Sequence, residues 1–181
     1  MDDFVLNPER PTPREIATTI GSLRVRYVGF DGQTHDGIME IHEELVPDLR
    51  DFFEAAFALG FPIERVVRSS DAMFGWDDDK LMAANATSGF NYRLIKGTDR
   101  PSLHGLGRAF DVNCRVNPYI RYIDGEQIID PPSATYDSSS PGALYANHPL
   151  VRIMKDRGWV WGGDWTAESG RTDYQHFEKK E

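Results

Sequence analysis

The stretch SLHGLGRAFD, residues 102–111, places a histidine and an aspartate seven residues apart around two glycines. Each glycine weakens a helix by about 1 kcal/mol relative to alanine, so Gly105 and Gly107 predict a tight turn here rather than a helix. From Gly107 onward the residues alternate as they do in a strand, which puts Asp111 on one face. We therefore expect His104, at the turn, and Asp111, in the strand, to point at one spot on the face of a sheet.

A second stretch, DYQHFE at residues 173–178, carries the same kinds of side chain. If Gln175 begins a strand, His176 and Glu178 share a face, and Asp173 lies on the loop that enters it. Two histidines and one carboxylate are a common ligand set for catalytic zinc, which keeps a further position for water. A hydrolase also needs a base, for which Asp173 and Glu178 are the candidates. Spacing alone leaves open the alternative that these are ordinary polar residues of loops, with no role in binding a metal.

Composition limits the classes of function. A chain of 181 residues predicts one domain. The formal net charge of −9 argues against nucleic acid as a partner, because phosphates require clustered lysine and arginine. The single cysteine, Cys114, excludes an intramolecular disulfide and is expected to be a small buried residue. The N-terminus lacks the pattern of a signal peptide, and no apolar stretch approaches the ~20 residues of a membrane span.

The hydrophobic pattern predicts both helices and strands. Apolar residues at helical spacing from Leu45 to Phe57, followed by Gly60, predict the clearest helix. Shorter helices are expected over 76–88 and 148–158. Strands are expected over 23–30, 38–42, 61–69, 90–95, 107–113 and on both sides of Asp124-Gly125 in 119–129, with two short ones in 159–178. The predicted fold is α+β: an irregular lead-in at residues 1–22, then one domain over 23–181 with a small, mostly antiparallel sheet and a few packed helices.

Together the two stretches resemble the signatures Ser-x-His-x-x-Gly-x-Ala-x-Asp and Asp/Glu-x-x-His of a family of zinc peptidases. This family contains D-alanyl-D-alanine carboxypeptidases and dipeptidases and the L-alanyl-D-glutamate endopeptidases of phage lysins, and it shares its architecture with the hedgehog signalling domain. The segments 85–119 and 158–165 are also similar to the family's core, so the resemblance covers roughly residues 25–178. It implies a hedgehog-type zinc peptidase domain over 23–181.

The resemblance also implies roles for individual residues. His104, Asp111 and His176 correspond to the ligands of one zinc ion. Asp173, three residues before the last ligand, corresponds to the general base. Arg93 corresponds to an arginine that polarises the scissile carbonyl and stabilises the oxyanion.

Three further residues are predicted to contact substrate. Ser102 corresponds to a polar residue of the family, and the aromatic residues Trp161 and Trp165 are candidate walls of the substrate site. The chain departs from the family pattern in small ways, among them Gly105 where alanine is expected. None of these departures removes a functional group.

These expectations define a zinc metallopeptidase that cleaves peptidoglycan stem peptides, as a D-alanyl-D-alanine carboxypeptidase. The alternatives are an L-alanyl-D-glutamate endopeptidase and a non-catalytic binding module that kept the fold and the zinc. We expect a monomer whose substrate lies in the cell wall or periplasm. Without a signal peptide in this sequence, synthesis is expected in the cytoplasm, with a route of export or release that the sequence does not define.

Overall fold

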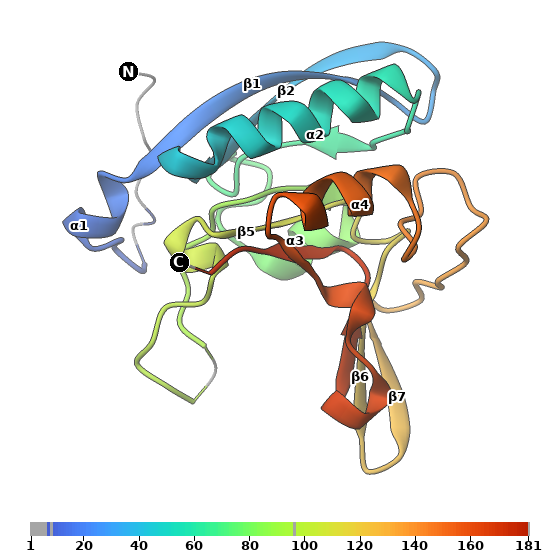
Figure 1. The fold of residues 1–181 in the computed structure, drawn as a ribbon. Coiled ribbons are helices and arrows are strands. Elements are labelled where there is room, and N and C mark those ends of the chain that lie inside the picture. Colours follow the sequence, from blue (N-terminus) through green and yellow to red (C-terminus); the bar gives the residue numbers. More distant parts are fainter. Residues whose placement is uncertain (1–6, 8, 96, 181) are drawn as a thin grey trace.

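The computed structural model describes residues 7, 9–95 and 97–180, and in this part of the chain the fold is α+β (Figure 1). The helices are α1 (Arg14–Ala17), α2 (Val46–Ala58), α3 (Asp78–Ala83) and α4 (Pro149–Asp156). The strands are β1 (Ile20–Val28), β2 (Thr34–His42), β3 (Arg65–Val66), β4 (Ala86–Thr87), β5 (Ala109–Asp111), β6 (Tyr119–Ile123), β7 (Glu126–Asp130), β8 (Val160–Trp161), β9 (Arg171–Asp173) and β10 (His176–Glu178). The described strands form four small sheets, and only β3 pairs with β4 in parallel.

The N-terminal layer is the long antiparallel hairpin β1–β2 with α2 lying along it (Figure 1). Alternating residues of β1, from Leu23 to Tyr27, are buried, as the strand period requires. Helix α2 carries Pro47 in its first turn and is followed by Gly60, whose φ of +63° ends the helical path. The predicted helix and hairpin are therefore confirmed.

The sheet β5–β10–β8 lies beneath α2, and its apolar face completes the core. Phe110 of β5 and Phe177 of β10 pair in register and stack with ring centroids 5.0 Å apart. Phe52 of α2 packs edge-on against Phe110 at 5.2 Å. Because side chains alternate across a strand, the neighbouring pair, Asp111 and His176, points to the opposite face.

The hairpin β6–β7, with β9 on its other edge, projects from the body of the molecule (Figure 1). It turns at Asp124 and Gly125, which both have positive φ, as the predicted two-residue hairpin turn requires. Helix α4 was also predicted, and the structure confirms it, with His148 as its N-cap. None of the described helices has the length and apolar character needed to cross a membrane.

Several predicted elements differ from the structure. Residues 90–95 do not form a strand, because their backbone groups bond to separate segments: Phe90 N–H to Glu40 O and Asn91 N–H to His104 O. The strand expected over 61–69 shortens to β3. The lead-in is not wholly irregular, since α1 and the start of β1 lie within it; residues 1–6 and 8 of that prediction lie outside the described residues.

The single sheet of the prediction is divided into the four described sheets. The C-terminal region 159–178 contains β8, β9 and β10 rather than two strands. As a result Asp173 is the last residue of β9 and pairs with Tyr119, instead of lying on a loop. The extra strand arises because the Gly170–Asp173 backbone follows the edge of β6, which the sequence pattern of so short a segment does not reveal.

Candidate metal centre

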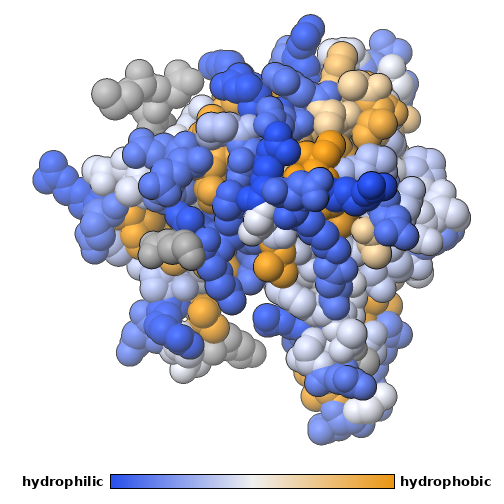
Figure 2. All heavy atoms as spheres, viewed as in Figure 1, coloured by the Kyte–Doolittle hydropathy of each residue, from blue (hydrophilic) through white to orange (hydrophobic). Residues whose placement is uncertain are grey.

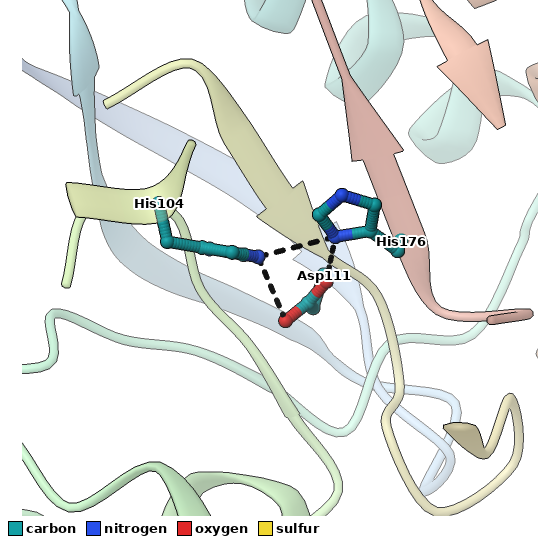
Figure 3. Close-up of side chains that lie close together, drawn as sticks. All are labelled: His104, Asp111 and His176. Carbon is teal, nitrogen blue, oxygen red and sulfur yellow. Dashed lines mark hydrogen bonds and ion pairs between the residues drawn. The ribbon is translucent and has the colours of Figure 1, made fainter. Parts of the chain in front are cut away.

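Three buried side chains converge on the polar face of the β5–β10 sheet (Figure 3). His104 Nε2 lies 3.2 Å from His176 Nδ1 and 3.3 Å from Asp111 Oδ2. His176 Nδ1 lies 3.0 Å from Asp111 Oδ1. In a tetrahedral site with bonds of about 2.0–2.1 Å, neighbouring ligand atoms are about 3.3 Å apart, so these separations fit one zinc ion.

The backbone brings the three residues together by two means. Asp111 and His176 are direct cross-strand partners in β5 and β10, so their side chains leave the sheet on the same face. His104 begins a short 3-10 turn, η2 (His104–Leu106), that ends at Gly107 with a left-handed φ of +65°. A Cβ at Gly107 would lie 2.8 Å from His42 N, so only glycine allows this turn to pack against β2. The predicted turn before a strand is confirmed.

The outer nitrogens of both histidines are engaged. His104 Nδ1 lies 2.9 Å from the carbonyl oxygen of Gly89 and therefore donates to it. His176 Nε2 lies 3.2 Å from Glu178 Oε2 and donates to that carboxylate. When both histidines are neutral and carry their protons on the outer nitrogens, the inner nitrogens and Asp111 offer only lone pairs to one another, and a cation is then needed at the centre.

The ionisation of the cluster agrees with this requirement. Burial raises the pKa of Asp111, but the charge and hydrogen bonds of His104 and His176 outweigh it and hold that pKa well below its usual range. Burial lowers the pKa of His176, but hydrogen bonds with Asp111 and Glu178 outweigh it and raise that pKa to about 10. Both shifts mean that Asp111 is an anion and that His176 carries a proton, which a cation at the centre of the cluster would replace. The residues present therefore fit a metal ion.

Asp173 lies beside this cluster with an unsatisfied carboxylate. Its Oδ1 is buried and has no hydrogen-bond partner among the described residues. Burial raises the pKa of Asp173 to about 7, against the charge of His176. A Cβ on Gly162 would lie 2.9 Å from Asp173 Cβ and 3.3 Å from His176 Cβ, so this glycine lets the two side chains start close together. A carboxyl group with a pKa near neutrality suits a general base.

Arg93 reaches the site from the irregular segment 90–95. Its Nη1 donates to Asp78 Oδ1 at 2.5 Å, and Asn91 Nδ2 approaches the same oxygen at 3.4 Å. Sequence reasoning missed Asp78, because the acidic run at the start of α3 indicates only a helix N-terminus. In the structure Asp77 caps that helix, while Asp78 holds Arg93.

These residues open onto a cavity of about 1,040 Å³. Figure 2 shows the molecule hollowed between two protrusions at its lower edge, which in Figure 1 are the loop that contains residues 97–101 and the β6–β7 hairpin. The cavity walls include the three cluster residues, Asp173, Arg93, Ser102 and Trp165. The volume is enough for a short peptide.

The predicted substrate residues divide into two groups. Ser102 and Trp165 line the cavity. Ser102 Oγ also accepts a hydrogen bond from Gly105 N–H at 3.0 Å and so supports the η2 turn. Trp161 does not line the cavity: it is 1 % exposed, and its Nε1 donates to the Tyr174 carbonyl in the core. The prediction that Trp161 forms a substrate wall is therefore wrong, because β8 turns this side chain inward.

Two other sequence features are explained by packing. A Cβ at Gly105 would lie 2.8 Å from the carbonyl oxygen of Arg93, so the alanine expected from the family pattern does not fit here. Cys114 is buried and its Sγ donates to the Ala86 carbonyl at 3.1 Å. Burial raises the pKa of that thiol well above its usual value, which makes Cys114 an inert packing residue.

Comparison with known proteins supports the same class of site. A family model described as D-alanyl-D-alanine carboxypeptidase matches residues 96–179. No curated protein and no solved structure matches the chain. The family match agrees with the resemblance seen in the sequence and covers the segment that carries both motifs. The matched segment holds His104, Asp111, His176 and Asp173, whereas Arg93 and Asp78 precede it.

Proposed function

We propose that this protein is a zinc-dependent D-alanyl-D-alanine carboxypeptidase of peptidoglycan stem peptides. The observation that carries the proposal is the buried His104–Asp111–His176 cluster, which opens into the cavity beside the unpaired carboxylate of Asp173. A binding module has no use for such a carboxylate, because burying it without a partner costs free energy. Catalysis therefore explains Asp173 better than a purely structural zinc site does.

The mechanism follows from what each residue can do. His104, Asp111 and His176 would hold the zinc ion, which would polarise the scissile carbonyl and lower the pKa of a bound water. Asp173, which lines the cavity, accepts the proton of the attacking water on its carboxylate and then delivers it to the leaving amine. Arg93, aimed by Asp78, donates to the oxyanion that develops on the scissile carbonyl.

The proposal includes several finer points that rest on the family and the substrate class. They are a hedgehog-type domain, one zinc ion per chain, a monomer, and action in the cell wall or periplasm. Trp165 and Ser102 are proposed to contact the substrate, since both line the cavity.

The test is cleavage of a purified stem pentapeptide followed by mass spectrometry, with Asp173→Ala as the inactive comparison. Loss of one terminal D-alanine by the wild type alone supports the proposal. A cut between L-alanine and D-glutamate assigns the endopeptidase activity instead. Zinc binding with no cleavage of either bond contradicts catalysis and leaves the binding module.

A further inference from the structure

One wall of the cavity is the face of β9 and β6 that carries Asp173. The register pairs Tyr119 with Asp173 and Arg121 with Arg171, so these four side chains share one face. All four line the cavity. Arg171 and Asp173 are two positions apart on one strand, which places their Cα atoms about 7 Å apart. Arg171 therefore stands next to the proposed base along the direction of the strand.

The cations around the cavity differ in their partners. Arg93 is paired with Asp78, Lys180 lies 3.6 Å from Glu178, and Arg121 binds Asp130 with its Nε at 3.0 Å and its Nη2 at 2.6 Å. No ion pair joins Arg171 to a carboxylate in the part of the chain that the structure describes. Instead its guanidinium lies over the Trp165 ring, 4.4 Å from the centroid.

This stacking orients the side chain of Arg171 and does not engage its N–H groups in hydrogen bonds. A guanidinium on an aromatic face keeps its N–H groups at the rim, free for a planar partner such as a carboxylate. The Trp165 ring itself lies 5.6 Å from the ring of His176. The Trp165 ring therefore lies between the guanidinium of Arg171 and the imidazole of His176, a residue of the metal cluster.

The two candidate substrate bonds share one chemical feature. In a terminal D-alanyl-D-alanine, and in the L-alanyl-D-glutamate bond of a γ-linked stem peptide, the carbon bearing the scissile nitrogen also carries a free α-carboxylate. We propose that Arg171, held over Trp165, binds this α-carboxylate of the leaving amino acid. This inference rests on the proposed function and defines its substrate class: amides whose leaving residue has a free carboxylate beside the bond that breaks.

The experiment compares free-acid peptides with their amides. The first pair is a stem pentapeptide ending in D-alanyl-D-alanine and the same peptide as a C-terminal carboxamide. The second pair is L-alanyl-γ-D-glutamyl-L-lysine and its isoglutamine form. Values of kcat/KM are measured for the wild type and for Arg171→Gln. Dissociation constants are measured with zinc-loaded Asp173→Asn, alone and combined with Arg171→Gln.

For the pair that is cleaved, we expect the wild type to prefer the free acid by about 10- to 100-fold, through KM more than kcat. Arg171→Gln reduces the preference to within about threefold; the readout is the ratio of free acid to amide within each variant, so a change that affects both peptides equally does not count. Arg121→Gln, the cross-strand neighbour whose charge Asp130 already neutralises, is the matched control and keeps the preference.

Arg100 is the rival cation, since it also lines the cavity. If Arg100→Gln removes the preference and Arg171→Gln keeps it, the assignment to Arg171 is overturned. An equal preference in wild type and Arg171→Gln overturns it as well. If no peptide of either pair is bound or cleaved, the proposed function itself fails, a result distinct from cleavage without discrimination.

Discussion

Asp111 and His176 face each other across β5 and β10, one residue along from the stacked pair Phe110 and Phe177. The same register therefore sets the core on one face of the sheet and the metal cluster on the other. A one-residue slip would exchange the two faces. This link between core packing and ligand geometry explains how so small a sheet holds the site.

Gly162 is predicted to be essential because it allows the proposed base, Asp173, to lie close to the metal ligand His176. In Gly162→Ala the new Cβ would lie 2.6 Å from the Asp173 carbonyl oxygen and 2.9 Å from its Cβ, so β9 has to shift. Displacements of this kind cost about 100-fold in rate. We expect kcat/KM to fall by about that factor while zinc is retained. Gly21→Ala, outside the cavity lining, is the control: its Cβ would make one tight contact, 3.3 Å to Val46 Cγ2, the end of a side chain rather than backbone.

Arg93 is predicted to act on turnover. Arg93→Ala removes the donor to the oxyanion, and we expect kcat to fall about 100- to 1,000-fold with little change in zinc content. A comparable loss of bound zinc would instead assign Arg93 a structural role at the cluster.

Asp78 is predicted to act through Arg93, whose guanidinium it holds. Asp78→Asn should lower kcat by about tenfold, less than loss of Arg93 itself, because the donor remains but is less well oriented. In the double variant the two effects should not add. Additive losses in this double-mutant cycle would show that Asp78 acts independently of Arg93.

Glu40 is predicted to make folding depend on pH. This side chain of β2 is 3 % exposed, and its Oε2 has no hydrogen-bond partner among the described residues. Burial raises the pKa of Glu40 from 4.5 to about 7, against the attraction of Arg68 and with the repulsion of Asp71. Between these pH values the folded state holds a proton that the unfolded chain has lost, so its stability falls as pH rises and the loss is complete above pH 7.

Glu40→Gln mimics the protonated side chain and should remove this loss. The difference in the free energy of unfolding, variant minus wild type, is expected to be about 2–3 kcal/mol larger at pH 8 than at pH 4.5, because only the wild type loses stability over this range. Denaturant titrations at a series of pH values, with saturating zinc, measure it. Glu54→Gln, at an exposed glutamate of α2, controls for the change in net charge. A difference independent of pH would contradict the buried-charge explanation.

The sequence predicted most reliably what local patterns control. The helix α2 and the hairpins β1–β2 and β6–β7 follow from hydrophobic period and turn residues, and the two motifs identify the cluster residues. The motifs identify these residues through the family resemblance, because their spacing alone did not decide whether they bind a metal. The wrong predictions concern features that depend on contacts between residues distant in the chain. These features are the path of residues 90–95, the inward orientation of Trp161 and the position of Asp173 at the end of β9.

Asp78 and Arg171 illustrate the same limit. Each is an ordinary surface charge in the sequence, and each acquires a role only from the residue that the fold places against it, Arg93 and Trp165 respectively. Short elements and turns lie between the two residues of each pair, so no helical or strand periodicity links them.

The most direct test of the central claim is the zinc content of the purified protein after dialysis, measured for wild type, His176→Ala and His35→Ala. His35 lies on β2 and pairs with Asp31, away from the cluster. We predict about one zinc ion per chain in wild type and His35→Ala, and loss of nearly all bound zinc in His176→Ala, because the cluster then keeps only two ligands. Wild-type protein without zinc, or zinc retained in full by folded His176→Ala, would contradict the account.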